Sequence, residues 1–216
     1  MSPHPLFGRM LEFNFLPSRT LHISRYGTYA LPALAQAVQA APSWQQAWHR
    51  HWSKRILRIL NIGAIENTRQ PELAVGLLTP QALTKLARRV GAVLCGTSLR
   101  HAIRGEQVRA LQSALGDELL TFARREVMRY EANLATWNAA IDVPHTLHGL
   151  EALGYGTMLT GLSQSTPELL RRVELKVPID IRGSDSPLPA AQAWQLCQAI
   201  LKDMDSVWCS FFPAVR

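Results

Sequence analysis

Hydrophobic residues recur every three or four positions along most of the chain, which is the period of an α-helix. Residues 44–60 show it most clearly, with an apolar stripe on one face and cations on the other. The stripe comprises Trp44, Trp48, Trp52, Ile56, Ile59 and Leu60, and the opposite face carries Arg50, Lys54, Arg55 and Arg58. Similar stripes follow over 83–94, 108–137 and 193–211. The pattern predicts a mainly α protein that forms a single compact helical domain over residues 1–216.

Capping and turn residues mark the expected ends of these helices. Ser43 with Gln46 fits a capping box, and Gly116 with Asp117 predicts a break inside the second half. Pro80, Thr146 and Pro167 stand where helices should begin. We expect residues 1–9 to form a tail and residues 181–189 to form a loop before the last helix, which should run on to Phe211.

The segment 173–178 fits two structures. Val173, Leu175 and Val177 alternate with charged residues as in a strand, yet they also continue the helix expected from Glu168. A segment of this length cannot decide between the two, so a short extended segment remains an alternative to helix.

Glycines inside the expected helices require a separate explanation. Gly91 interrupts the stripe over 83–94, and Gly154, Gly156 and Gly161 lie close together. The second group lacks the spacing of a dinucleotide-binding loop, because Leu159 stands where its third glycine would be. Small residues that let two helices approach closely explain these glycines better.

Charge is distributed unevenly along the 216 residues. The chain carries 23 Lys and Arg against 16 Asp and Glu, a net charge of +7, and hydrophobic residues make up 47% of it. Residues 1–109 hold 14 basic and 4 acidic residues, and residues 110–216 hold 9 and 12. Arg outnumbers Lys. A GC-rich coding sequence, which favours Arg codons, explains this excess, and so does recognition of carboxylates or phosphates by the planar guanidinium. The asymmetry between the halves favours an acidic partner.

Few residues of the types used in catalysis or metal binding occur in the chain, and those present lack the spacing of a catalytic or metal site. His49 and His51 point to different sides of a helix, and no carboxylate or Cys follows His145 and His148 at ligand spacing. Cys95 and Cys197 fall on apolar stripes and should be buried. We therefore expect no catalytic, metal or cofactor site. The start of the chain does not resemble a signal peptide, and we expect no transmembrane span.

The residues around Gly91 resemble the SctK/YscK family of type III secretion proteins. Residues 86–100, LARRVGAVLCGTSLR, are similar to a family stretch of Leu-x-x-Arg-x-Gly-x-x-Leu-x-Gly followed by Leu or Ile and Arg. Residues 13–22, 173–178 and 191–212 are similar to other parts of the family, in the same order, whereas residues 43–75 match poorly. The resemblance spans the chain.

This resemblance implies a non-enzymatic adaptor of the sorting platform of an injectisome, largely helical and without a cofactor. Such an adaptor would lie in the bacterial cytoplasm, at the cytoplasmic face of the inner membrane. Its direct partners would be the cytoplasmic domain of the inner-membrane ring (SctD type) and the pod protein (SctQ type). Through the pod it would be connected to the stator and the ATPase.

Two groups of residues are candidates for binding these partners. The basic half offers Arg88, Arg89, Arg100 and Arg104 to an acidic surface, and the C-terminal helix offers an apolar anchor of Trp208, Phe211 and Phe212. The aromatic residues equally fit a buried core, and Arg100 equally fits a structural ion pair. The alternative function is a basic helical nucleic-acid-binding or regulatory protein, which lacks the support of a recognised nucleic-acid-binding motif.

Overall fold

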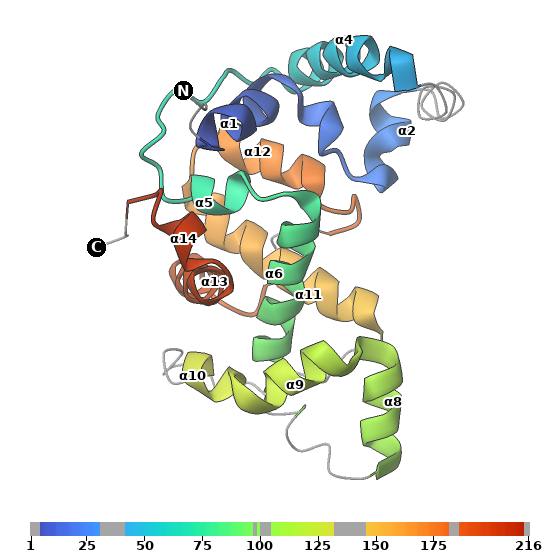
Figure 1. The fold of residues 1–216 in the computed structure, drawn as a ribbon, viewed down its shortest axis with the longest axis vertical. Helices are drawn as coiled ribbons and strands as arrows, with labels where there is room; N and C mark the ends of the chain where they lie inside the picture. The colour runs from blue at the N-terminus through green and yellow to red at the C-terminus, as the bar shows by residue number, and fades with distance from the viewer. Residues whose placement is uncertain are drawn as a thin grey trace. The chain divides into compact units, whose positions relative to one another are not determined.

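The computed structural model describes residues 5–30, 42–96, 99, 105–131, 146–181 and 186–213. Most of these residues are helical and none of them lies in a strand, which confirms the mainly α prediction (Figure 1). They group into two compact units. Unit 1 comprises Met1–Pro80, Ser165–Asp180 and Phe212–Arg216, and unit 2 comprises Gln81–Gln164 and Ile181–Phe211. The single domain over 1–216 stays a prediction.

Unit 1 gathers helices from both halves of the sequence. Its elements are α1 (Pro5–Phe15), η1 (Pro17–Arg19), η2 (Ile23–Arg25), α2 (Tyr26–Tyr29), α4 (Pro42–Leu60), α5 (Leu73–Gly76) and α12 (Pro167–Lys176). Trp52 and Ile56 of α4 lie in one buried cluster with Leu21, Tyr29 and Leu175. Trp48 and Leu60 are partly buried and pack against this cluster, so four residues of the apolar stripe predicted on α4 contribute to the core, whereas Ile59 is 55% exposed. The side chain of Trp44 lies outside the described part of the chain.

Unit 2 is a set of packed helices around α11 and α13. Its elements are α6 (Pro80–Leu94), α8 (Gly105–Leu115), α9 (Asp117–Arg125), α10 (Val127–Glu131), α11 (Leu147–Gly161), η3 (Leu162–Gln164), α13 (Ala190–Met204) and α14 (Ser206–Cys209). Helix α11 packs along α13. Leu86, Leu150, Met158 and Ile200 are almost fully buried, so α6, α11 and α13 share a core.

Several predicted helix ends are confirmed. Helix α6 begins at Pro80, and Thr146 caps α11 by accepting a hydrogen bond from the Gly149 amide at 3.1 Å. Gly116 separates α8 from α9 with φ +83°, a conformation that glycine adopts readily. Helix α12 begins at Pro167 and continues to Lys176, so residues 173–176 are helical, and Val177, which follows the helix, adopts an extended conformation.

Other predicted boundaries are wrong. Helix α1 begins at Pro5, so residues 5–9 are not a tail. Ser43 lies inside α4, which begins at Pro42, and it cannot be the predicted cap. The last helix does not reach Phe211, because it ends at Met204 and Asp205 adopts an extended φ of −156°. The Asp205 side chain accepts a hydrogen bond from the Trp208 amide at 2.8 Å and so starts α14. Of the predicted loop, residues 182–185 lie outside the described residues.

Glycines bring the helices of unit 2 into backbone contact. A Cβ on Gly154 of α11 would overlap the Ala87 carbonyl of α6, and a Cβ on Gly91 would overlap the Leu150 carbonyl. A Cβ on Gly161 would lie 2.8 Å from the Trp194 nitrogen of α13. The interpretation of these glycines as sites of close helix approach is thereby confirmed.

Helix α12 carries two buried cations in unit 1. Arg172 is 1% exposed and donates to the carbonyls of Phe13 (3.1 Å), Asn14 (3.4 Å) and Glu168 (3.1 Å). Lys176 is 4% exposed, and its Nζ donates to the carbonyls of Gly76 (2.6 Å) and Leu78 (2.9 Å). Apart from the Glu168 carbonyl, which lies in α12 itself, these backbone oxygens belong to the ends of other segments, and the two cations therefore tie α1 and α5 to α12.

The pKa of Lys176 is lowered to about 7, chiefly by burial, while the Glu12 charge opposes the shift and the Arg9 charge adds to it. Between pH 7 and the ordinary lysine pKa of 10.5, the unfolded chain therefore binds more protons at this site than the folded chain does. Stability due to Lys176 should rise with pH across this window, by at most about 1.4 kcal/mol per pH unit.

We expect the unfolding free energy of the native chain, minus that of Lys176→Met, to increase from pH 7 to pH 9.5. Urea unfolding at several pH values measures this difference. Lys202→Met, at an exposed position on α13, is the control for the loss of a lysine charge, and its effect is measured at the same pH values. A difference for Lys176→Met that stays constant with pH would contradict the prediction.

Candidate protein-interaction site

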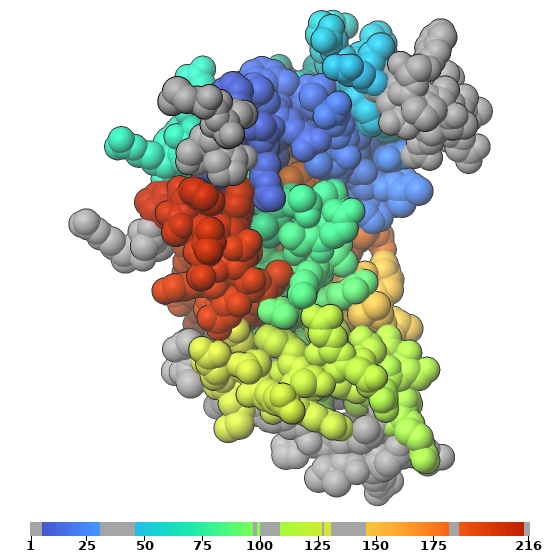
Figure 2. All heavy atoms as spheres, in the orientation of Figure 1, coloured from blue at the N-terminus to red at the C-terminus, as the bar shows by residue number. Residues whose placement is uncertain are grey.

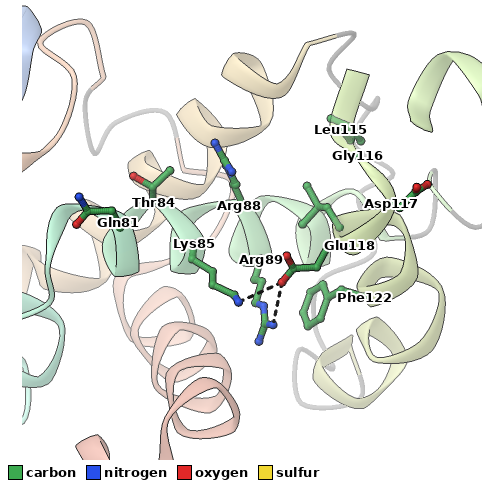
Figure 3. Close-up of a pocket in the computed structure, with 11 residues that line it drawn as sticks. Gln81, Thr84, Lys85, Arg88, Arg89, Leu115, Gly116, Asp117, Glu118 and Phe122 are labelled. Carbon is green, nitrogen blue, oxygen red and sulfur yellow. Dashed lines mark ion pairs between the residues drawn. The ribbon is translucent and has the colours of Figure 1, made fainter. Parts of the chain in front are cut away.

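A charged groove lies between α6 and the α8–α9 junction in unit 2 (Figure 3). It encloses about 540 Å³. Its lining from α6 is polar and cationic, and its lining from α8 and α9 is apolar and acidic. The α6 residues are Gln81, Thr84, Lys85, Arg88 and Arg89, and the others are Leu115, Gly116, Asp117, Glu118, Leu119 and Phe122.

The sequence places these cations along one edge of α6. The apolar side of α6 packs into the core through Leu83, Leu86 and Val90. The border of this apolar side carries the cations Lys85, Arg88 and Arg89. On the opposite wall, the turn at Gly116 directs the first residues of α9 to the groove. The groove is therefore built by an amphipathic helix and a glycine break.

Glu118 pairs with two of the cations that line the groove. Its Oε1 lies 3.1 Å from Lys85 Nζ and 3.8 Å from Arg89 Nη2, and Figure 3 shows both side chains directed at it. The hydrogen bond from Lys85 holds the pKa of this carboxyl below its usual value, with the Lys85 charge acting in the same direction. Because the Glu118 side chain is 77% exposed, water screens these ion pairs.

Arg89 is also held by an aromatic ring. Its guanidinium carbon lies 5.0 Å from the centre of the Phe122 ring, and its side chain is 21% exposed. A cation over a ring face gains electrostatic energy as well as packing. Arg89 is therefore ordered by contacts within unit 2.

Arg88 points away from Glu118 in Figure 3 and binds α11 instead. Its Nε and Nη2 each lie 2.7 Å from Oε1 of Glu151, whose side chain is only 17% exposed. Thr84 and Tyr155 make a second polar contact between the same helices, with their hydroxyl oxygens 2.7 Å apart. Arg88 thus supports the packing of α6 on α11 as well as lining the groove.

The C-terminal aromatic candidates are mostly buried. Trp208 is 6% exposed and Phe212 9%, whereas Phe211 is 38% exposed and lies edge-on to Trp208, with 6.3 Å between ring centres. Of these three residues, only Phe211 offers a large surface to a partner. Arg100 and Arg104 lie outside the described residues.

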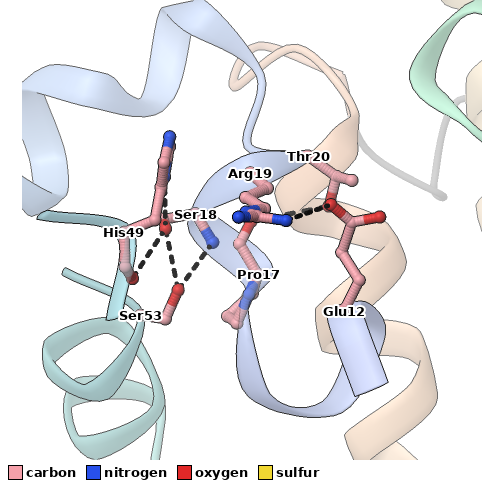
Figure 4. Close-up of polar contacts among 7 residues, drawn as sticks. All are labelled: Glu12, Pro17, Ser18, Arg19, Thr20, His49 and Ser53. Atoms are coloured by element: carbon pink, nitrogen blue, oxygen red, sulfur yellow. Dashed lines mark hydrogen bonds and ion pairs between the residues drawn. The ribbon is translucent and has the colours of Figure 1, made fainter. Parts of the chain in front are cut away.

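Unit 1 contains a serine–histidine cluster that the sequence analysis missed (Figure 4). Ser18 Oγ lies 2.9 Å from His49 Nδ1 and 2.7 Å from Ser53 Oγ, and the Ser18 amide donates to Ser53 Oγ at 3.2 Å. Ser18 and Ser53 are almost fully buried, and burial lowers the pKa of His49. Because residues 18 and 49 are far apart in sequence, no local spacing could indicate this pair. The cluster fixes η1 on α4.

Two of the cysteines behave as the sequence indicates. Cys95 and Cys197 are buried, and burial raises the pKa of each thiol to about 12. Cys209 is partly exposed, and burial raises its pKa as well. In the described ranges, no cluster of three His, Cys, Asp or Glu side chains is placed to hold a metal ion. No helix in these ranges is long and apolar enough to cross a membrane.

The described residues thus define an all-helical protein with a charged, ion-paired groove. Residues 9–211 match the family described as YOP proteins translocation protein K (YscK), and the chain belongs to this family of type III secretion proteins. Comparison with curated proteins and with solved structures found no match. The family resemblance predicted from residues 86–100 is therefore confirmed over most of the chain.

Proposed function

We propose that this protein is a non-enzymatic adaptor of a type III secretion injectisome. It links the cytoplasmic domain of the inner-membrane ring (SctD type) to the pod protein (SctQ type) and acts at the cytoplasmic face of the inner membrane. The observation that supports the proposal is the YscK family match over residues 9–211. Through the pod protein, the adaptor is connected to the stator and the ATPase.

An adaptor must bind two bodies at the same time. The direct test is copurification of the purified chain with the ring domain and the pod protein of the same secretion system. We expect a complex of all three proteins on size-exclusion chromatography, and no complex of ring domain and pod protein when the chain is left out. Failure of the chain to hold both proteins in one complex would refute the adaptor function.

The groove of unit 2 is the first surface to test within this function. Replacing Arg88 and Arg89 with Gln removes two cations and leaves Glu118 and Glu151 without those partners. We expect the double variant to bind one of the two proteins about tenfold more weakly, since each partly exposed charge contact contributes roughly 0.5–1 kcal/mol.

The matched control is Arg124→Gln with Arg125→Gln, two exposed cations in the last turn of α9. It changes the net charge equally and should leave both affinities unchanged. Calorimetric titration measures the affinities, and circular dichroism checks that both variants stay folded. Equal binding by the folded groove variant and the native chain would exclude the groove as a contact surface.

A further inference from the structure

A line of positive charge runs along the exposed side of α4 in unit 1. Arg50, Lys54 and Arg58 follow one another at intervals of four residues, and Arg55 lies beside them. All four side chains are exposed, and Figure 2 shows α4, in blue to cyan, at the surface of the molecule. Residues four apart on a helix lie about 6 Å from each other. We call these four residues the α4 cationic face.

The charge of the α4 cationic face is not balanced by neighbouring acids. The sequence contains no Asp or Glu between Glu12 and Glu66. In the part of the chain that the structure describes, no carboxylate forms an ion pair with any of the four residues. The cations of the groove in unit 2, by contrast, are each paired with Glu118 or Glu151. The larger attraction for an acidic partner therefore lies on α4.

The buried side of α4 holds this face in place. Trp52 is 3% exposed and Ile56 is fully buried, and Ser53 is fixed by Ser18. A helix anchored in this way presents its cations at fixed spacing, which reduces the entropy lost on binding. Trp52 and Ile56, at the centre of the apolar side of α4, are already buried in unit 1, so they are not available to insert into a lipid bilayer.

We propose that the α4 cationic face docks an acidic surface of a protein partner, such as a helix whose carboxylates lie one turn apart. Three of the four cations are Arg, and the planar guanidinium pairs with a carboxylate through two parallel hydrogen bonds. Ile59 lies one turn beyond Arg55, is 55% exposed and adds an apolar contact beside the charges. Protein interfaces commonly combine apolar and charged contacts in this way. This inference rests on the proposed function, because it assigns one of the adaptor's two contacts to a defined surface.

The test replaces Arg50, Lys54 and Arg58 together in the full chain, with Gln in one variant and Glu in another. A charge-conserving variant, Arg50→Lys with Lys54→Arg and Arg58→Lys, shows whether charge alone is sufficient. The control for net charge is Arg124→Glu with Arg125→Glu and Lys202→Glu, which reverses three exposed cations in unit 2. Binding is measured to the ring domain, the pod protein, phosphatidylglycerol vesicles and a random DNA duplex.

We expect the Gln variant to bind one of the two proteins about tenfold more weakly, and the Glu variant about a hundredfold more weakly. The affinity of the native chain for that protein should fall with salt more steeply than the affinity of the Gln variant. The unit 2 control should stay within about threefold of the native chain. The charge-conserving variant should bind more tightly than the Gln variant and more weakly than the native chain, because it keeps all three charges but has only one guanidinium among these positions instead of two. Circular dichroism and thermal melting confirm that each variant is folded.

Three results would overturn the inference. If the native chain binds both proteins and the folded Glu variant binds them equally well, the α4 cationic face is not a contact surface although the adaptor function stands. If the variants lose binding only to vesicles or only to DNA, the occupant is a membrane or a nucleic acid. If the native chain binds neither protein, the proposed function fails and the inference fails with it.

Discussion

Replacing Gly154 with Ala is expected to destabilise the protein by about 3 kcal/mol or more, although Ala normally favours a helix over Gly. A Cβ at this position would lie 2.6 Å from the carbonyl carbon of Ala87, and the obstacle is backbone rather than a flexible side chain. Helices α6 and α11 would have to move apart, which would open the core around Leu86 and Leu150. Urea unfolding followed by circular dichroism measures the loss.

Gly8 provides the matched control for this substitution. It is also a helical glycine, in α1, but apart from its chain neighbours and the local helix backbone no atom lies within 4 Å of the position that its Cβ would take. Gly8→Ala should therefore stabilise the protein by roughly 0.5–1 kcal/mol, through helix propensity alone. If Gly154→Ala stabilised the chain as Gly8→Ala does, the close packing of α6 on α11 would be wrong.

Replacing Arg172 with Met is expected to have an effect of similar size, a loss of about 3 kcal/mol. The native guanidinium is almost fully buried and donates to the carbonyls of Phe13, Asn14 and Glu168. Methionine fills much of the volume but offers no donor, so these oxygens lose a partner that water cannot easily replace. The measurement is again the free energy of unfolding in urea.

Arg172→Lys keeps the positive charge and removes the planar guanidinium, so it separates the effects of these two properties. A lysine ammonium keeps the charge but lacks the planar fork that reaches separate carbonyls, so we expect about half the loss seen with Met. Arg171→Met is a positional control, because Arg171 is exposed and donates to the Leu60 carbonyl from the surface. If the free energy of unfolding of Arg172→Met lies within about 1 kcal/mol of that of the native chain, the buried guanidinium does not tie α1 to α12.

The sequence predicted the helices well where local chemistry determines them. Pro80, Thr146 and Pro167 mark true helix starts, because a cap or a fixed φ acts within one turn. Gly91 and Gly154 pointed to close helix packing, because a glycine inside a helix has a cost that only a close neighbour offsets. The break at Asp205 was missed because the apolar stripe continues past it to Trp208 and beyond.

The candidate site was less predictable, because it depends on contacts between distant residues. The sequence analysis offers Arg88 and Arg89 to an acidic partner, yet Glu151 and Glu118 of the same chain pair with them across sequence separations that local patterns do not cover. Trp208 and Phe212 fitted a core or an anchor equally well on their periodicity, and only the tertiary structure places them among buried residues. Lys176 in turn occurs in a charged, alternating segment, where nothing indicates that its Nζ reaches the Gly76 carbonyl.

The interleaved order of the two units has a consequence for how the chain is made and cut. Helix α12 belongs to unit 1, whereas α11 before it and α13 after it belong to unit 2. During synthesis, the first eighty residues must therefore wait for α12 to leave the ribosome before Arg172 and Lys176 can bind them. No single truncation point releases either unit whole, so a fragment for separate study needs a linker in place of the other unit's segment, such as one that replaces residues 81–164 within unit 1.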